Sequence, residues 1–291
     1  MILVVGGTGR LGVRVTRDLA GIGQPFRIMA RGRSQPFLEQ GRSEFEVFRG
    51  TLSSASDCQH AVEGCEQVIF AASGFGLKTG GTPRSVDRDG ALRLMEAAEH
   101  VGVRHMVMMS MYGAAADAPM EFLRMKYAAE EALRSSGMGW TIIRMGANLE
   151  QFLAVMSQPL ETQGKVIVFG SGGMPVTFTS TADAAALAGR ALSDPVLGGQ
   201  TIEWGSGTYS LNELASAILA NAGRGAIKRI PVPALRIMSV AARAFSPFMA
   251  RMAAAALWME SGAAAFDPAL QRKSLPDIPV FGLEESLNPS P

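Results

Sequence analysis

Three glycines at a fixed spacing follow the first apolar run of the chain, and such a spacing is typical of a phosphate-binding loop. The segment from Val4 to Gly12 reads VVGGTGRLG and contains the pattern G-x-G-x-x-G. Glycine is needed because a side chain would keep the backbone away from a pyrophosphate and crowd the strand against the next helix. That helix would point its free N–H groups and positive dipole end at the phosphates. The alternative is a tight turn without function. The residues predicted to bind the dinucleotide are Gly6, Gly7, Thr8, Gly9, Arg10, Leu11 and Gly12.

The residues after the second apolar run indicate which dinucleotide is preferred. A site for NAD presents Asp or Glu to the ribose 2′-hydroxyl about 20 residues after the glycines. This chain instead has Arg31, Arg33 and Ser34 there, with no carboxylate between Phe26 and Ser34. Two guanidinium groups, with Arg10 from the glycine loop, would bind a 2′-phosphate. We therefore predict NADP(H) in preference to NAD(H); the alternative is a solvated basic turn.

Short β-branched runs alternate with helical patterns in the first half of the chain. This alternation predicts right-handed crossovers and a doubly wound, mostly parallel α/β sheet. Apolar runs without polar alternation, such as Ile2–Val5, are expected for strands buried on both faces. The helical patterns cover about 10–20, 54–62, 85–101 and 120–136. The predicted strands are Ile2–Val5, Phe26–Met29, Glu44–Phe48, Gln67–Ala71, His105–Met109 and Trp140–Arg144.

The regular alternation of strand-like and helical patterns becomes weaker beyond residue 146. We predict a Rossmann domain over 1–147 and a smaller, mainly helical substrate lobe over 148–291, with segments within about 176–205 returning to the first domain. The Ala- and Met-rich tail from about 227 is expected to form a small helical lobe. Further elements are predicted as helices at 148–157, 182–192 and 210–222 and strands at 165–169, 176–179 and 200–204.

Composition excludes several classes of function. The chain has 291 residues, with 27 basic and 26 acidic side chains, so neither nucleic acid nor a membrane surface is an expected partner, although a local basic cluster could hide within this total. Two cysteines and three histidines are too few and too scattered for a metal site. The chain enters a strand-like run at once, without a basic leader or an apolar segment, which predicts a cytoplasmic protein. It would act as a monomer or homodimer.

The order of the motifs resembles the NmrA-like family of atypical short-chain dehydrogenase/reductases. Besides the glycine loop and the arginine-tipped second strand, the resemblance includes the segment Lys126 to Glu130, and it covers about residues 1–220. It implies an NAD(P)-binding protein with a small-molecule substrate. The family usually has Asp where Thr51 stands. The resemblance assigns further cofactor contacts to Thr51, Leu52, Ala71, Ala72, Ser73 and Lys126.

Short-chain dehydrogenases normally use a Tyr-x-x-x-Lys pair, in which the lysine lowers the pKa of the tyrosine and holds the nicotinamide ribose. Here the lysine is Lys126, but Phe122 occupies the place of the tyrosine. Lys126 would still bind the ribose or act as an acid; alternatively, it is a surface lysine paired with Glu130 at i,i+4. Tyr112 is a substitute acid or a packed loop aromatic. Ser110, which the family places at its catalytic serine, would orient the acceptor or is an ordinary turn residue.

A glycine-rich segment, residues 73–81, follows the fourth predicted strand, and the substrate would lie next to it. This segment would act as a lid over the cofactor and substrate; alternatively, it is simply a long surface loop. Phe75, Asn148 and Phe152 are the predicted substrate contacts. The leading hypothesis is an NADPH-dependent reductase that passes hydride to a small apolar carbonyl, enone or quinone. The alternative is a non-catalytic NADP(H)-binding redox sensor, regulatory or assembly protein. A sugar epimerase or dehydratase is disfavoured because those mechanisms depend on the missing tyrosine.

Overall fold

The chain forms two compact units. The computed structural model describes residues 1–32, 45–76 and 81–288. One unit contains Met1–Arg144 and Ala184–Ile202, and the other contains Met145–Asp183 and Glu203–Pro291.

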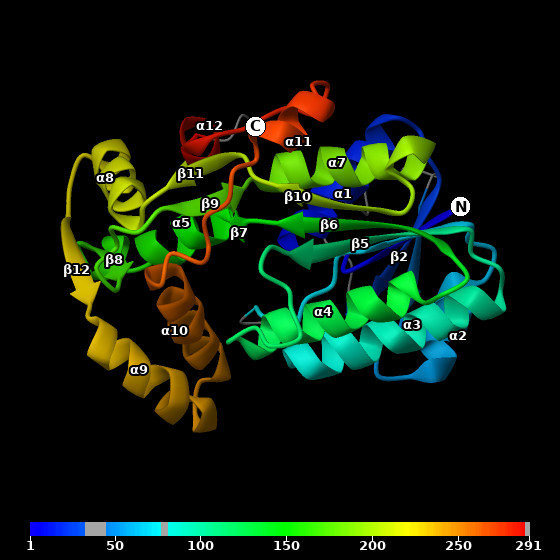
Figure 1. The fold of residues 1–291 in the computed structure, drawn as a ribbon, viewed down its shortest axis with the longest axis horizontal. Coiled ribbons are helices and arrows are strands. Elements are labelled where there is room, and N and C mark those ends of the chain that lie inside the picture. The colour runs from blue at the N-terminus through cyan, green and yellow to red at the C-terminus, as the bar shows by residue number, and fades with distance from the viewer. Residues whose placement is uncertain (33–44, 77–80, 289–291) are drawn as a thin grey trace. The chain divides into compact units, whose positions relative to one another are not determined.

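The first unit is organised by a sheet in which seven strands of the described chain follow the order β10-β6-β5-β4-β1-β2-β3 (Figure 1). β1 pairs in parallel with β2 and with β4, and parallel pairing continues to β3 and β5. All four residues of β1 are buried, as expected where helices cover both faces of a sheet. These strands are β1 (Ile2–Val5), β2 (Phe26–Ala30), β3 (Phe45–Arg49), β4 (Gln67–Phe70), β5 (His105–Met111), β6 (Gly139–Met145) and β10 (Gln200–Trp204).

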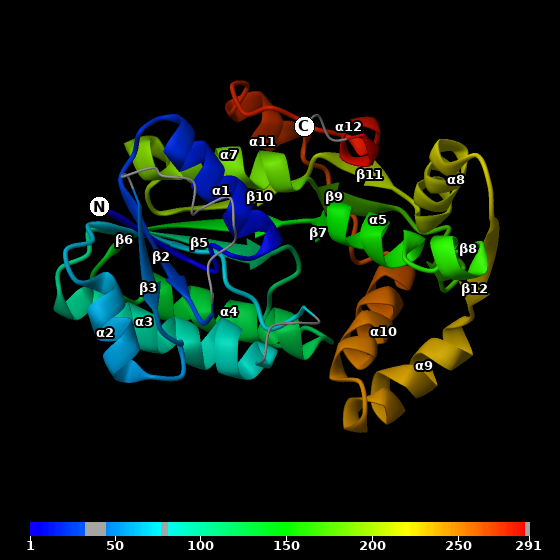
Figure 2. The ribbon, with the colours of Figure 1, turned by 180° about the vertical axis from the view of Figure 1, so that it is seen from behind.

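Helices cover the sheet on two sides. Helices α1 and α7 lie on one face, and α2, α3 and α4 lie on the other (Figures 1 and 2). The predicted doubly wound α/β fold is confirmed. The helical segment predicted over 85–101 is instead a π-helical turn followed by α3. The bounds are α1 (Arg10–Gly21), α2 (Ala55–Val62), η2 (Arg84–Arg88), α3 (Asp89–His100), α4 (Glu121–Arg134), α7 (Thr181–Ser193) and η3 (Pro195–Leu197).

The second unit contains two small sheets, with orders β11-β9-β7 and β12-β8. The tail predicted to be helical from about 227 begins instead with strand β12, which pairs in parallel with β8. Its strands are β7 (Ala147–Asn148), β8 (Lys165–Phe169), β9 (Val176–Thr179), β11 (Gly207–Tyr209) and β12 (Ala226–Ile230). Its helices are α5 (Leu149–Ser157), α6 (Leu160–Gln163), α8 (Leu211–Ala222), α9 (Val232–Ala241), η4 (Ala242–Ala244), α10 (Pro247–Glu260), α11 (Ala269–Ser274) and α12 (Leu283–Leu287).

Asp183 holds segments of the second unit together. Its buried carboxylate accepts hydrogen bonds from the Ser180 and Ser206 hydroxyls at 2.5 and 2.7 Å, and from the Trp204 indole at 3.3 Å. It also accepts the backbone N–H of Phe281 at 2.9 Å. A buried carboxylate is tolerated only when its oxygens are satisfied in this way. The interaction therefore fixes the C-terminal segment against the start of α7.

Neither cysteine of the chain is disulfide-bonded. Cys58 and Cys65 are both buried in the core of the first unit. Burial raises the pKa of the Cys58 thiol to about 11, so it is a poor nucleophile at neutral pH. None of the helices in the described parts of the chain combines the length and apolarity that a bilayer span requires.

Two leucines of helix α3 allow the contribution of the first unit's core to the free energy of unfolding to be measured. Leu94 is fully buried in this core, whereas Leu92, on the same helix, is 39% exposed. We expect Leu94→Ala to lower the free energy of unfolding by about 2–5 kcal/mol through lost burial and a residual cavity. Leu92→Ala, its control, should change it by less than about 1 kcal/mol. Urea denaturation of both variants tests the assignment, and equal losses would contradict it.

Candidate functional site

The glycine loop connects β1 to α1 at the point where the strand order of the sheet reverses, which is where open α/β sheets bind ligands. Gly6 has a φ of +86°, and its carbonyl accepts the N–H of Gly9 at 2.9 Å. A Cβ on Gly12 would overlap the Gly6 carbonyl oxygen, and one on Gly7 would lie 2.8 Å from Ile28. Backbone at Gly12 and the Ile28 side chain at Gly7 therefore fill the space that a Cβ would occupy, as the fingerprint of a dinucleotide site requires.

The first turn of α1 is open to an anion. Gly9 precedes the helix, and no side chain among the described residues caps it. The first turn carries no acidic residue, while Arg10 is exposed there and Thr8 and Leu11 are half-buried. A helix N-terminus with uncapped N–H groups and a nearby arginine favours phosphate binding. The loop and helix together fit the pyrophosphate of a dinucleotide.

Arg31 is exposed immediately after β2, which pairs with β1. Arg31 therefore lies at the same carboxyl edge of the sheet as the glycine loop. Arg33 and Ser34 lie outside the described residues.

Thr51 follows β3, where the family usually has Asp. A carboxylate does reach this segment, but from α2: Asp57 accepts the N–H of Thr51 at 2.8 Å. Sequence reasoning missed Asp57, because nothing in the spacing links it to Thr51. Leu52 packs beside Gly90, and a Cβ on Gly90 would lie 2.8 Å from the Leu52 side chain. After β4, the backbone of Ala71 and Ala72 passes close to Gly6. A Cβ on Gly6 would lie 2.7–2.8 Å from backbone atoms of these two residues.

Lys126 is buried and forms an ion pair with Asp87. Its Nζ lies 3.0 Å from Asp87 Oδ1 and donates to the carbonyl of Met109 at 2.8 Å. Asp87 is fully buried, and its other oxygen accepts the N–H of Gly74 at 2.7 Å. Burial raises the pKa of Asp87, and the positive charge of Lys126 opposes that rise. The alternative of a surface lysine paired with Glu130 is wrong, since Lys126 is only 4% exposed.

The ring of Phe122 lies beside this ion pair, and the ring of Phe75 packs on that of Phe122. Phe122, in the place of the family's tyrosine, packs on Phe75 with ring centroids 5.0 Å apart. The Lys126 Nζ is 5.7 Å from the centroid of the Phe122 ring. The structure thus brings the predicted residues Phe75 and Lys126 together with Asp87, which was not among the predicted site residues. Ser73 accepts the N–H of Phe75 at 3.1 Å and adjoins the same loop.

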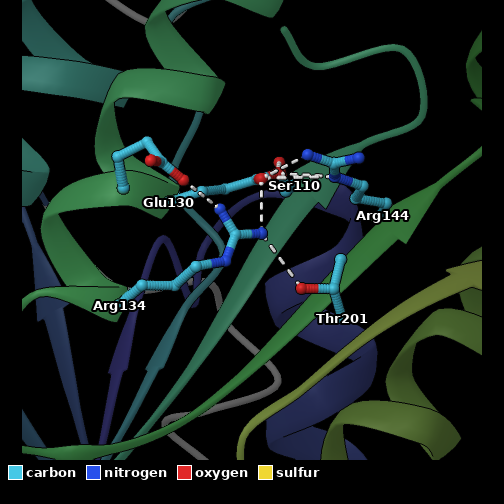
Figure 3. Close-up of polar contacts among 6 residues, drawn as sticks. Ser110, Glu130, Arg134, Arg144 and Thr201 are labelled. Atoms are coloured by element: carbon cyan, nitrogen blue, oxygen red, sulfur yellow. Dashed lines mark hydrogen bonds and ion pairs between the residues drawn. The ribbon is translucent and has the colours of Figure 1, made fainter.

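Ser110 belongs to a second buried cluster, centred on Glu130 (Figure 3). Its hydroxyl donates to the Glu130 carboxylate, which is fully buried. Arg144 approaches the same carboxylate at 2.7 Å and Arg134 at 3.1 Å, and Arg134 also donates to Thr201 at 3.0 Å. The cluster thereby links β5, α4, β6 and β10. The Ser110 proton points at Glu130, so a role on substrate stays a prediction.

Tyr112 lies in the turn directly after β5, half-buried. The Met109 carbonyl that binds Lys126 belongs to the same strand. Tyr112 therefore stands at the carboxyl edge of the sheet, where open α/β folds bind their ligands.

The other two predicted substrate contacts lie in the second unit and have partners there. The Asn148 amide oxygen caps α5 by accepting the N–H of Gln151 at 2.8 Å, and its amide nitrogen donates to Thr181 at 3.2 Å. Phe152 is 5% exposed and packs edge-on against Phe178. A substrate role for Asn148 and Phe152 stays a prediction.

Comparisons with known proteins agree with the geometry of the glycine loop and the first turn of α1, residues 6–12, which we call the cradle. The chain is 30% identical over 226 residues to an NAD(P)H azoreductase of Xenophilus azovorans, which covers 77% of this chain and 74% of the relative. It is 25% identical over 256 residues to the photosystem II assembly factor Ycf39 of Synechocystis, covering 85% and 74%.

Among solved structures, the chain superposes on an NADPH-dependent quinone oxidoreductase of Escherichia coli, complexed with NADPH, with a TM-score of 0.78 at 21% identity, covering 99% of each chain. A nucleoside-diphosphate-sugar epimerase of Staphylococcus aureus gives 0.79 at 19% identity, covering 97% of this chain and 98% of the other. At these identities the likeness shows the fold alone. The sequence pattern of NAD(P)H-binding proteins matches residues 6–195. The chain therefore belongs to the NAD(P)H-binding family, as its resemblance to NmrA-like proteins predicted.

Proposed function

We propose that this protein is an oxidoreductase that uses NADPH to reduce a small apolar carbonyl, enone or quinone. The observation that carries the proposal is the buried Lys126–Asp87 pair beside the rings of Phe75 and Phe122. A buried ion pair is expensive to desolvate, so a purely structural role is a poor explanation for one placed at this edge of the sheet. The NAD(P)H azoreductase among the similar proteins supports the same class of reaction.

The cofactor would be held by the residues of the cradle. The glycine loop and the first turn of α1 would bind the pyrophosphate, and Arg31 with Arg10 the 2′-phosphate. The segments that contain Thr51 and Ala72 would border the adenine and nicotinamide sides, respectively. Once bound, reduced nicotinamide supplies the hydride.

Lys126 would hold the nicotinamide ribose. Two of its contacts, with Met109 and Asp87, fix the position of the ammonium group. Its remaining hydrogen-bonding capacity would serve the ribose hydroxyls. The phenol of Tyr112 would give a proton to the reduced acceptor. The one proton of the Ser110 hydroxyl is donated to Glu130, so this hydroxyl would have to turn away from Glu130 in order to orient the acceptor.

The acceptor would be apolar and flat. The half-buried ring of Phe75, backed by the buried ring of Phe122, offers an aromatic surface. Aromatic rings favour offset or edge-to-face contacts with other rings. Phe122 offers no hydroxyl to a sugar, which argues against the epimerase chemistry of some structural neighbours.

A binding protein without catalysis is the second candidate. The specific observation in its favour is Phe122, because the usual acid of the family is replaced by a ring without a proton to give. Similarity to the photosystem II assembly factor Ycf39 also favours this candidate. Such a protein would bind NADP(H) and report its redox state to a partner.

Stopped-flow oxidation of NADPH by a panel of quinones and enones decides between the two candidates. We expect turnover with at least one acceptor, and a loss of about 10²-fold in Tyr112→Phe, the lower end of the range of general acid catalysis, because a reduced quinone or enone is a weak base. Tyr127→Phe, a change on the neighbouring helix α4, should leave the rate unchanged. Tight NADPH binding without turnover of any acceptor would sink the enzyme proposal and favour the binding protein.

Cofactor preference is tested at Arg31. We expect Arg31→Ala to weaken NADPH binding by about 1.5–3 kcal/mol, the range for hydrogen bonds to charged groups, while NADH binding is spared. Arg104→Ala is the control, because Arg104 is exposed and precedes β5, at the opposite edge of the sheet. Fluorescence titration with both nucleotides measures the difference. Equal losses for NADPH and NADH would refute the 2′-phosphate role.

The cradle itself is tested by adding one methyl group. Gly12→Ala places a Cβ against the Gly6 carbonyl, so we expect at least about a tenfold loss of NADPH affinity and a lower melting temperature. Gly21→Ala, at the far end of α1, is the control because its Cβ would meet nothing within 4 Å. Undiminished NADPH binding by Gly12→Ala would show that the cofactor does not use this loop.

A further inference from the structure

Charge is distributed very unevenly along the chain. Between Leu214 and Met259 the sequence contains six basic residues and none of the 26 acidic ones, which leaves 21 basic and 26 acidic residues for the rest. A net charge of +1 therefore conceals a strongly basic segment in the second unit. The basic residues are Arg224, Lys228, Arg229, Arg236, Arg243 and Arg251.

Large apolar side chains are exposed in the same segment. Ile237 is 68% exposed, Val240 64% and Phe245 78%. Single exposed apolar residues are ordinary, but three of this size within nine residues form a cluster that requires an explanation.

Helical geometry gathers four of these residues on one face, and Phe245 directly follows the last helical turn. In α9 and η4 the inward positions are Leu235 and Ala242, seven residues apart, and both are buried. Arg236, Val240 and Arg243 follow a spacing of four and three residues, and Ile237 adjoins them. We call Arg236, Ile237, Val240, Arg243 and Phe245 the α9 face.

We propose that the α9 face docks on an anionic lipid surface. An amphipathic helix of this kind inserts its apolar side chains at the boundary between headgroups and acyl chains, while its arginines reach back to the phosphates. Arg243 already lies along the helix, since it donates to the Ser239 carbonyl at 3.0 Å. The helix would lie on the membrane and would not cross it.

Charge complementarity favours lipid over a second copy of the chain. Two α9 faces brought together would oppose arginines to arginines, which costs energy in an apolar interface. An anionic bilayer offers apolar depth and negative charge at once, and each basic residue near it contributes about a fivefold gain in affinity.

Vesicle co-sedimentation of the full-length protein tests this proposal. We expect binding to phosphatidylcholine vesicles that contain about a third phosphatidylglycerol, weakening with added salt, and little binding to phosphatidylcholine alone. Arg236→Ala and Arg243→Ala should each weaken binding about fivefold, and Phe245→Ser at least about tenfold. Ile22→Ser, at an equally exposed apolar residue, should bind as the unaltered protein does.

Three results would overturn the proposal. The first is equal binding to neutral and anionic vesicles. The second is undiminished binding by the triple variant of Arg236→Ala, Arg243→Ala and Phe245→Ser. The third is the absence of vesicle binding. In that case, self-association that is abolished by Phe245→Ser would assign the α9 face to a second copy of the chain. Retention on immobilised polyglutamate that is lost in the triple variant would instead assign the α9 face to an acidic protein. Thermal melting should be similar for all variants, because the altered side chains are exposed.

Discussion

The buried ion pair of Lys126 and Asp87 is the constraint on which the geometry of the first unit's site depends. Two charges removed from water are stable only if their remaining hydrogen-bonding groups are satisfied. Gly74 supplies a donor to the carboxylate, and Met109 an acceptor to the ammonium. The pair therefore fixes the loop after β4, the turn before α3 and the end of β5 relative to α4. Most of the proposed chemistry is assigned to segments that meet there.

The backbone around Asp87 shows how closely this region is held. Asp87 lies in η2, a π-helical turn, and such turns frequently mark functional sites. A Cβ on Gly74 would overlap the carbonyl of Thr82, so the loop passes directly against the segment that leads into η2. Together, these contacts explain why Phe75 meets Phe122: the Gly74 N–H that binds Asp87 precedes Phe75 by one residue.

Local patterns predicted the fold, whereas long-range pairing decided the site. Continuous apolar runs and spaced glycines located β1, β4 and the cradle, because those signals lie within a few residues of each other. For Lys126, i,i+4 spacing offered a surface pairing with Glu130 only as the alternative to a cofactor role. Glu130 binds Arg144 and Ser110 instead, and the carboxylate that pairs with Lys126 is that of Asp87, 39 residues away in sequence. Strand β12 was missed because four of its five residues are exposed, which removes the alternation that marks a strand.

Phe122 narrows the acceptors that the proposed enzyme could reduce. With a tyrosine there, the neighbouring lysine would promote proton transfer to a strongly basic alkoxide. With phenylalanine, the charge of Lys126 is matched by Asp87, and a proton must come from Tyr112 or from water. Reduction of a quinone or an enone gives a delocalised phenolate or enolate, which is a weaker base than an alkoxide. These reductions therefore depend less on a positioned acid than the reduction of a simple ketone does. The loss of the tyrosine is therefore more compatible with quinones and enones than with simple ketones.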